Sequence, residues 1–428
     1  MNLVSTYVIG AGVTGLSFAV TLGYGKVLES NPGLGGKASS YNMNTHVGKF
    51  TFDIGGHWFH HQNAPKVLQL LEGLSLEKHA RQAFVYWEGG LYDFPLQQSY
   101  KTHADNSLVQ QIDRELAALG QKEATKSQNY SDMLLNSYGP TLFERFFRDY
   151  NVKMFGVSDL SQIQIGKYEE IRNVRTNQKT EGYNSYFYYP KDPLGAQAIP
   201  VHLAKDVQVR FNSQVQSIHL NQRTISINKQ TSPWETIIST IPLPRLVSMI
   251  ADVDCGIAYL SQQLRASRGL ILNLGVKRNL LHANKSWIYL AEMKYHFYRI
   301  GFYSNVQPDM APEGYSSMYV ECSPLFFKNK QEALYIVPQV IRDLISIGMI
   351  EDESDIVTLK PIYLEQNYCL PDNQVTSLIQ SYLQQYGIYS IGRYGSWHWS
   401  SQHEDMQQAI SLADELRRTI NFRKLLKV

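Results

Sequence analysis

The feature that most constrains this chain is a glycine pattern close to its N-terminus. An apolar, strand-like run at residues 7–9 leads directly into Gly10, Gly12 and Gly15, the first, third and sixth places of G-x-G-x-x-G, and a helix-like apolar run follows at once. Glu29 closes the next strand, about 20 residues after the first glycine, as a dinucleotide fingerprint requires. Gly10 permits the tight turn, Gly12 admits a pyrophosphate to the backbone, and Gly15 lets helix and strand pack closely. The pattern therefore predicts an α/β domain that binds a dinucleotide at a helix N-terminus, with Glu29 on a ribose hydroxyl.

Length and composition set wider limits. The chain has 428 residues, enough for two or three domains, and a formal net charge of +2, so no bulk field favours nucleic acid. No apolar run is long enough to cross a membrane, and the start lacks the basic region of a signal peptide. Cys255, Cys322 and Cys369 are scattered, which predicts buried, reduced thiols in a cytoplasmic protein. The oligomeric state stays open.

Two further glycine pairs refine the prediction. Gly35 and Gly36, with Lys37 after them, follow the ribose-binding acid, where a loop could fold back over a cofactor. Gly55 and Gly56, with His57 after them, follow an apolar strand. Adjacent glycines let a flat ring system lie against bare backbone. A zinc site at the histidines is not expected, because no ligand set is completed nearby. Flavoproteins of the amine-oxidase and glutathione-reductase-like superfamily carry the first pair as Gly-Gly-Arg, and this resemblance implies FAD.

Changes in hydrophobic periodicity divide the chain. Two short strands flank a hairpin signal at residues 88–90, a helical pattern covers residues 107–155, and β-like runs at residues 270–276, 287–290, 297–303 and 317–322 precede a predicted helix at 334–350. The expected fold class is α/β, with a Rossmann-like FAD-binding domain, an inserted helical domain and a mostly antiparallel β-sheet substrate domain. The expected boundaries are residues 1–97, 195–250 and 386–428 for the FAD-binding domain, 98–180 for the helical insertion, and 181–194 and 251–385 for the substrate sheet.

Further motifs are spread along the chain beyond the glycine fingerprint. They are Asp53-Ile54-Gly55-Gly56-His57, Phe94-Pro95-Leu96-Gln97, Asp149-Tyr150-Asn151-Val152-Lys153-Met154-Phe155-Gly156-Val157, Trp287-Ile288-Tyr289, Phe297-Tyr298-Arg299, Ser304-Asn305, Asn367-Tyr368 and Gly392-Arg393-Tyr394-Gly395-Ser396-Trp397. Through these motifs the whole chain resembles the UDP-galactopyranose mutases, in particular their longer eukaryotic-type branch. The FAD signature is specific only to the superfamily, and the later motifs indicate the mutase branch.

The resemblance implies an enzyme that interconverts the pyranose and furanose forms of a nucleotide sugar for surface polysaccharide synthesis. Reduced FAD would act as a nucleophile through N5, forming an adduct at the anomeric carbon while the nucleotide diphosphate leaves. NAD(P)H is a candidate reductant. The substrate would be a small molecule, and neither its sugar nor its base is fixed by the sequence.

Carried over position by position, the resemblance also implies the site. Arg299 would bind the diphosphate, Tyr289 and Tyr368 would donate hydroxyls to it, and Asn184 and Arg393 would face the sugar and flavin. His57 would lie on a loop that senses the redox state of the flavin. The remaining implied residues are Asn151, Gln97, Phe94, Trp399 and Arg172 on the substrate side, and Val215, Gly392 and Gln402 at the cofactor.

Other interpretations of these residues stay open. Arg299 could be half of a surface ion pair, although its Tyr/Phe-rich strand argues against full exposure. Tyr289 and Tyr368 could be ordinary sheet tyrosines. Two alternative functions also remain: a flavin oxidoreductase of the amine-oxidase type, which takes hydride from its substrate, and a non-catalytic protein that binds flavin and a sugar nucleotide.

The chain departs from the mutase pattern at its diphosphate site. Trp399 stands where the pattern has a tyrosine, and it can donate only through its indole nitrogen. A second arginine is expected near Glu170, where only Arg172 or Arg175 could serve if the register shifts. Phe155 and Phe94 likewise replace a tryptophan and a tyrosine. A carboxylate in place of a cation would oppose diphosphate binding by repulsion.

Overall fold

The glycine fingerprint follows the central strand of a five-stranded parallel sheet, whose strand order is β19-β13-β1-β2-β9. The computed structural model describes residues 5–60, 64–102, 104–121, 127–165, 185–278 and 283–425. The strands are β1 (Thr6–Ile9), β2 (Lys26–Leu28), β9 (Val209–Arg210), β13 (Thr236–Ser239) and β19 (Ile388–Ser390). Segments far apart in sequence therefore return to β1, which places the turn after Ile9 at the centre of the sheet edge.

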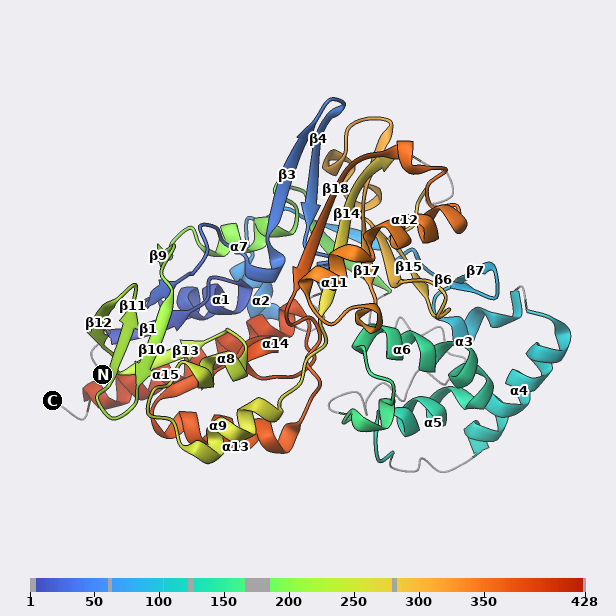
Figure 1. The fold of residues 1–428 in the computed structure, drawn as a ribbon. Coiled ribbons are helices and arrows are strands. Elements are labelled where there is room, and N and C mark those ends of the chain that lie inside the picture. The colour runs from blue at the N-terminus through green and yellow to red at the C-terminus, as the bar shows by residue number, and fades with distance from the viewer. Residues whose placement is uncertain are drawn as a thin grey trace.

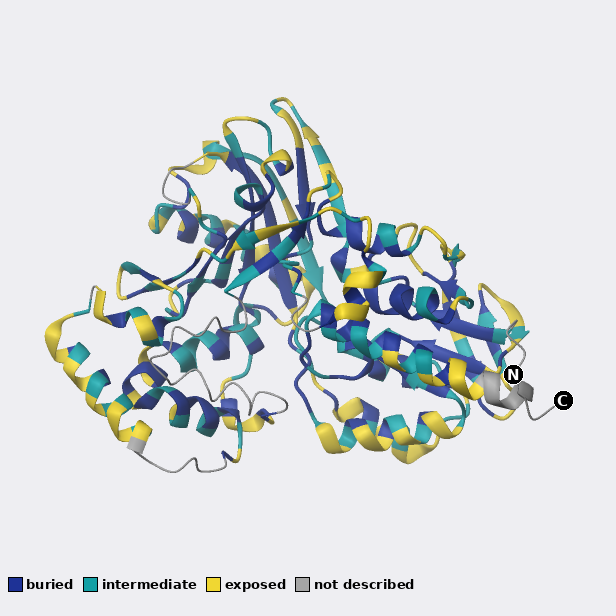
Figure 2. Cartoon of the chain, turned by 180° about the vertical axis from the view of Figure 1, so that it is seen from behind, coloured by how far each residue is buried: buried dark blue, intermediate teal, exposed yellow. Residues whose placement is uncertain are grey.

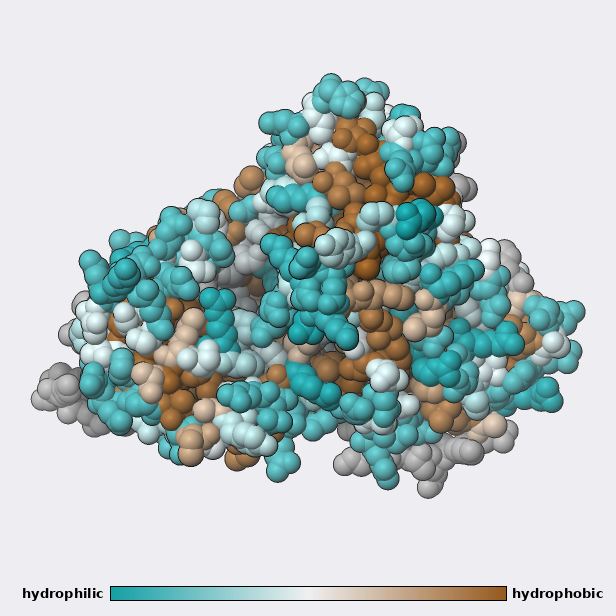
Figure 3. Space-filling model, in the orientation of Figure 1, coloured by the Kyte–Doolittle hydropathy of each residue, from teal (hydrophilic) through white to brown (hydrophobic). Residues whose placement is uncertain are grey.

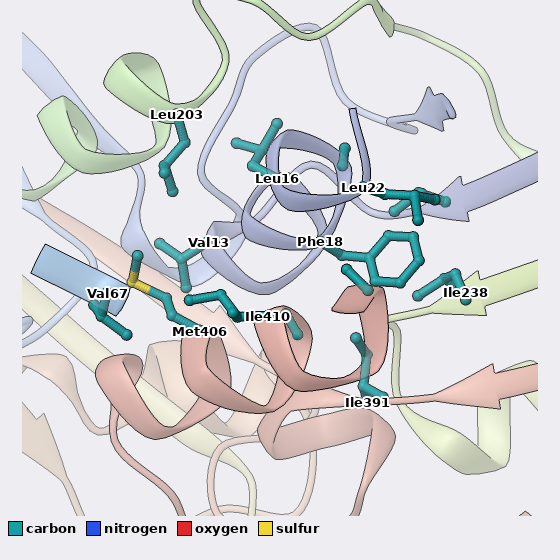
Figure 4. Close-up of a cluster of buried hydrophobic side chains, with 14 of the residues drawn as sticks. Val13, Leu16, Phe18, Leu22, Val67, Leu203, Ile238, Ile391, Met406 and Ile410 are labelled. Carbon is teal, nitrogen blue, oxygen red and sulfur yellow. The ribbon is translucent and has the colours of Figure 1, made fainter. Parts of the chain in front are cut away.

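A helix pair covers one face of this sheet. Helix α1 (Val13–Leu22) follows the glycine turn and packs against α15 (Gln402–Leu425), with α2 (Pro65–Leu70) and α7 (Ala198–Leu203) beside them. Leu16 and Phe18 of α1 and Met406 of α15 are fully buried. Figure 4 shows Val13 of α1 beside Met406 and Ile410 of α15, with Leu16 on the side of Leu203. Each such side chain contributes roughly 1.5–3 kcal/mol on burial. The packing fixes the N-terminus of α1.

The opposite face has its own apolar core around Trp234 and Trp397. A three-stranded antiparallel sheet and three helices build it. These elements are β10 (Val215–His219), β11 (Thr224–Ile227), β12 (Gln230–Pro233), α8 (Leu243–Ser248), α9 (Cys255–Gln263) and α13 (Asn373–Gln385). Cys322 and Cys369 are buried as predicted, but the prediction for Cys255 is wrong. Cys255 is exposed because it opens α9 immediately after the capping Asp254, at a surface end of the helix.

A seven-stranded sheet lies above and between the two lower parts of the molecule (Figure 1), in the order β18-β14-β17-β16-β15-β6-β7. Only the β15–β6 pair is parallel, which agrees with the expected mostly antiparallel sheet. The strands are β6 (Ala83–Trp87), β7 (Gly90–Asp93), β14 (Gly269–Lys277), β15 (Trp287–Leu290), β16 (Phe297–Phe302), β17 (Tyr315–Cys322) and β18 (Ile356–Leu364).

Helices α11 (Lys330–Tyr335) and α12 (Val337–Ser346) cover this sheet, and α10 (Tyr303–Val306) follows β16. The helix predicted at residues 334–350 is confirmed over Val337–Ser346, but it does not begin as one continuous helix at residue 334. The chain breaks at Ile336, because Pro338 stands in the first turn of a new helix, where a proline needs no hydrogen-bond partner for its nitrogen.

Two smaller antiparallel pairs connect the sheets: β3 (Ser40–Thr45) with β4 (Gly48–Asp53), and β5 (Leu76–Ala80) with β8 (Tyr186–Pro190). The end of β4 is held by Asp53, a fully buried carboxylate. Asp53 accepts hydrogen bonds from Ser40 Oγ (2.6 Å), Tyr189 Oη (2.6 Å) and Ala196 N (3.1 Å). This network fixes the start of the turn that contains Gly55 and Gly56.

The helical segment stands apart from the parallel sheet, at the lower right of Figure 1. It contains α3 (Leu96–Ser99), α4 (Asn106–Gln121), α5 (Tyr130–Leu142), a π-helical turn (Phe143–Phe147) and α6 (Arg148–Phe155). Its outer helix α4 carries many exposed residues, shown in yellow in Figure 2. The inner helix α6 is fastened to the sheet region, because buried Lys153 donates to the carbonyl of Glu292 (2.9 Å) and Ser323 Oγ donates to that of Lys153 (2.9 Å). Within the described residues, no helix is both long and apolar enough for a membrane span.

Candidate functional site

One cavity of about 1190 Å³ connects the parallel sheet, the seven-stranded sheet and the helical segment. Its lining begins at the glycine turn after β1 and ends among aromatic side chains of α5, α6 and β15. In Figure 3, hydrophobic surface, in brown, runs along the middle of the face where the sheet meets the helical segment. The cavity thus has a glycine-lined half and an aromatic half.

Bare backbone forms the first half. Gly10, Gly12 and Gly36 line the cavity, and a Cβ on Gly12 would approach only the carbonyl of Gly35, at 3.7 Å. Gly12 also begins α1 without any side-chain cap, so the first amides of the helix are left for a ligand. Gly15 lies outside the lining. A Cβ there would stand 2.1 Å from the carbonyl oxygen of Gly10, so this glycine serves helix–strand packing.

Glu29 lies at the carboxyl end of β2 and lines the same cavity with only 5% of its surface exposed. Its Oε2 accepts from the backbone N–H of Ala11 (2.9 Å), and its Oε1 accepts from the backbone and side-chain N–H groups of Asn31 (both 2.9 Å). A carboxylate oxygen can accept more than one hydrogen bond, so the fixed carboxylate can still receive a ribose hydroxyl.

Two cations flank the glycine turns. Lys37 Nζ donates to the carbonyl of Gln366 (2.9 Å), and burial lowers the pKa of Lys37 to about 8. Arg393, in the short helix α14 (Gly392–Gly395), donates through Nε and Nη2 to the carbonyl of Ser400. Burial raises the pKa of Asp405, at the start of α15, to about 6. These groups and Gln402 surround the place where α15 begins.

The Gly55-Gly56-His57 turn lies where the two halves meet. Gly55 has a left-handed backbone (φ +81°) and its N–H donates to Tyr303 Oη (3.1 Å). A Cβ on Gly56 would stand 2.4 Å from Tyr319 Oη, so no side chain fits. His57 Nδ1 contacts the carbonyl of Gly55 (3.1 Å), and burial lowers the pKa of His57 to about 4. His57 is therefore neutral at pH 7.

Arg299 in β16 faces the cavity at this junction. Its Nη2 donates to both carboxylate oxygens of Glu321 (2.6 Å each) and to Tyr368 Oη (3.1 Å). The side chains of Arg299 and Glu321 are 21% and 7% exposed. Arg299 is thus half of an ion pair, as one interpretation of the sequence allowed, but the pair is enclosed rather than on the outer surface.

The aromatic half is closed by side chains from separate elements. Phe155 of α6 and Trp399 stack with ring centroids 4.9 Å apart, and Tyr130 contacts both edge-on. Trp399 Nε1 donates to the carbonyl of Cys369 (2.6 Å), so its one indole hydrogen is used inside the protein. Phe94 packs against Tyr289 at 5.1 Å. Phe155 and Trp399 therefore lie together in one wall, and Phe94 lines the same cavity beside Tyr289.

Asn151 is also held internally. Its Nδ2 donates to the carbonyl of Phe147 (2.7 Å) and its Oδ1 accepts from Tyr130 Oη (3.0 Å). Asn151 lines the cavity, but its amide is bonded to α5 and to the π-helical turn before α6.

The structure brings most of the predicted residues together. Those that line the cavity are Gly10, Gly12, Glu29, Gly36, Lys37, Gly55, Gly56, His57, Phe94, Asn151, Val215, Tyr289, Arg299, Tyr368, Gly392, Arg393, Trp399 and Gln402. Gln97 lies in α3 outside the lining. Asn184, Arg172, Arg175 and Glu170 fall outside the described residues, so the second diphosphate position stays a prediction.

Sequence reasoning missed Glu321. It lies directly across from Arg299 in the β16–β17 pair. The register of two paired strands cannot be predicted from a local sequence pattern. Trp287 and Tyr150 also line the cavity, and both belong to motifs that the sequence had marked without a role. Within the ranges that the structure describes, no group of three or more His, Cys, Asp or Glu side chains could hold a metal ion.

The glycine-lined half fits a flavin dinucleotide. Uncapped amides at α1 and the open space at Gly12 suit a pyrophosphate, Glu29 suits a ribose, and the glycine turn at 55–56 leaves backbone for a flat ring. Lys37 and Arg393 add positive charge beside it. The chemistry of this donor set is that of a dinucleotide site.

Comparison with known proteins agrees with this geometry. The model of the family described as flavin containing amine oxidoreductase matches residues 13–281, more than half of the chain. A crystal structure of reduced UDP-galactopyranose mutase is similar with a TM-score of 0.84 and 23% identity, covering 96% of this chain and 95% of that one.

Two oxidases share the fold at lower similarity. A putative protoporphyrinogen oxidase from Exiguobacterium sp. 255-15 has a TM-score of 0.73 and 14% identity, covering 97% and 98% of the two chains. A putrescine oxidase double mutant has a TM-score of 0.66 and 13% identity, covering 96% and 98%. The mixed α/β fold is that of flavin-dependent oxidases and mutases, and the family match indicates a flavin-dependent enzyme. The chain belongs to the flavin-containing amine oxidoreductase family.

Proposed function

We propose that the protein is an FAD-dependent mutase that interconverts the pyranose and furanose forms of a nucleotide sugar. The observation that carries this proposal is the position of Arg299. Arg299, Tyr289 and Tyr368 line the same cavity as the glycines of the glycine-lined half, and Arg299 lies at the junction of the two halves. A sugar held between them would have its diphosphate at Arg299 and its anomeric carbon toward the flavin ring.

Different residues would bind the cofactor, stabilise the leaving group and exclude water. Gly12, the α1 amides and Glu29 would hold FAD, which when bound in reduced form supplies a nucleophile for the anomeric carbon. Arg299 and the hydroxyl of Tyr368 would stabilise the negative charge that develops on the departing diphosphate. The aromatic wall of Phe155 and Trp399 would exclude water and so strengthen these interactions.

The structural similarity favours this proposal over other members of the family. The mutase structure has a TM-score of 0.84, whereas the two oxidases reach 0.73 and 0.66 over comparable shares of the chain. The sheet and helical segment that frame the aromatic half are included in that similarity, because 96% of this chain is covered.

The test is an isomerisation assay on the purified, flavin-loaded protein. After reduction with dithionite, we expect UDP-galactofuranose to be converted to UDP-galactopyranose, with no conversion by the oxidised protein. Product is measured by anion-exchange chromatography. Replacement of dithionite by NADH or NADPH tests the expected reductant. Absence of conversion by fully reduced, flavin-loaded protein would rule out this substrate.

A second candidate is an FAD-dependent oxidoreductase that takes hydride from an uncharged or aromatic substrate. The observation that favours it is the wall of the aromatic half, where Trp399 and Asn151 use their donors internally and Phe94 and Phe155 have none. Such a wall binds apolar groups well and phosphate poorly. Substrate-driven bleaching of the flavin absorbance without isomerisation would support this candidate.

A further inference from the structure

Arg299 carries a counter-ion that belongs to the protein. Glu321 lies directly across from it in the β16–β17 pair, and both oxygens of the carboxylate are 2.6 Å from Nη2 of the arginine. The Glu321 side chain is only 7% exposed, so solvent screens the pair weakly. The charge that a diphosphate would use is already neutralised.

Glu321 also lies on the ligand side of the arginine. Its Oε1 is 3.5 Å from the position that a Cβ on Gly55 would take, and both residues line the cavity. The carboxylate is therefore beside the turn where the flavin ring is expected, and not behind Arg299 in the sheet core. An anionic group that approaches Arg299 from the cavity meets this carboxylate.

The rest of the cavity does not offset it. Among its described lining residues, four basic side chains (Lys37, Arg245, Arg299 and Arg393) face four acidic ones (Glu29, Glu321, Glu365 and Asp405). The pyrophosphate of FAD adds further negative charge. Once FAD is bound, the described lining residues therefore supply no excess positive charge for a second anionic group.

We propose that Glu321 is a specificity-determining residue that competes with the substrate's anionic group for Arg299. It holds the arginine when the substrate half is empty, and it must release it, wholly or in part, when a diphosphate binds. Affinity for charged ligands is thereby held down, whereas affinity for uncharged parts of the substrate is untouched. This inference rests on the proposed nucleotide-sugar function.

The test compares ligands that differ only in charge. Calorimetric titration of flavin-loaded protein with UDP and with uridine is carried out on the wild type and on Glu321→Gln, which keeps the shape of the side chain and removes its charge. We expect Glu321→Gln to bind UDP about tenfold more tightly or better, and uridine unchanged. Glu77→Gln, on the exposed strand β5, is the matched control and should change neither affinity.

Glu321→Asp protects the test against misfolding. It keeps the charge but shortens its reach, so UDP affinity should rise by less than in Glu321→Gln. Flavin content and the thermal midpoint report folding of each variant. If Glu321→Gln does not retain flavin, the aspartate variant decides alone: tighter UDP binding supports competition, and unchanged or weaker binding overturns it.

The outcomes separate two failures. Unchanged or weaker UDP binding by folded Glu321→Gln, beside measurable UDP binding by the wild type, would show that Glu321 orients Arg299 instead, and only the competition model would fall. No binding of UDP by either protein, with flavin still bound, would overturn the competition model and the nucleotide-sugar function together.

Discussion

The two halves of the cavity recognise their ligands by opposite means. The glycine-lined half offers backbone amides, open space and one fixed carboxylate, Glu29, and most of it comes from residues 9–57. The aromatic half offers side chains from elements scattered between Phe94 and Trp399. The comparison teaches that the cofactor half depends on the absence of side chains, whereas the substrate half depends on which side chains are present. Changes in the first should act by steric exclusion, and changes in the second by altered affinity.

The largest expected effect is at Gly15, which lies outside the cavity lining and sets the packing behind the glycine turn of the cofactor half. Gly15→Ala would place a Cβ 2.1 Å from the carbonyl oxygen of Gly10, a backbone atom that cannot move aside without distorting the turn. We expect loss of bound flavin and a fall in the free energy of unfolding of about 3 kcal/mol or more, as for severe overpacking. The flavin absorbance per protein and urea unfolding measure the two effects.

Gly33→Ala is the matched control for that change. Gly33 lies in the exposed loop that follows β2, and a Cβ added to it would have no heavy atom within 4 Å beyond its chain neighbours. It should retain flavin at the wild-type level. Equal loss of flavin in the two variants would contradict the steric explanation.

Removal of the cation in the substrate half should have the next largest effect. Arg299→Ala should weaken UDP binding by roughly 2–5 kcal/mol, because a buried charge is truncated and Glu321 is left to repel the ligand. The flavin spectrum should stay intact, because the Arg299 side chain is not part of the glycine-lined half that would hold FAD. Calorimetry with UDP measures the loss, and Arg342→Ala on α12 serves as the control. Unchanged UDP affinity in Arg299→Ala would remove this arginine from the substrate half.

The smallest effect is expected at the boundary of the halves, where Asp53 ends β4. Burial raises the pKa of Asp53 to about 6, so the folded protein binds a proton there between about pH 4 and 6 that the unfolded chain releases. Stability from this group is complete below about pH 4 and is lost as the pH rises through 6, by at most about 3 kcal/mol. Asp405 acts in the same direction and His57 in the opposite one.

Asp53→Asn isolates that contribution. The difference in unfolding free energy between the variant and the wild type should change in favour of the variant between pH 4 and 7, as measured by urea unfolding at each pH. Because Asp405 and His57 are the same in both proteins, their contributions cancel. A difference that is constant across this range would contradict the assignment.

Much of the fold could be predicted from sequence because the evidence is local. The glycine turn, the β6–β7 hairpin and the helical run before Phe155 each follow from backbone preference and hydrophobic spacing within a short window. The errors are local too: Pro338 divides a predicted helix, and Cys255 is exposed at the start of another. For the site, most of the residues that the glycine fingerprint and the family motifs predicted do line the cavity.

The sequence by itself determined where the backbone turns sharply or touches another segment. Such places need a residue without a Cβ, so each glycine of the motifs marks one of them directly. The partner of Arg299 was decided only by the tertiary structure. Glu321 reaches it through the register of two paired strands, and Trp399 meets Phe155 only when a distant loop and α6 pack together. Such contacts depend on the whole arrangement of segments, so no stretch of the chain contains them.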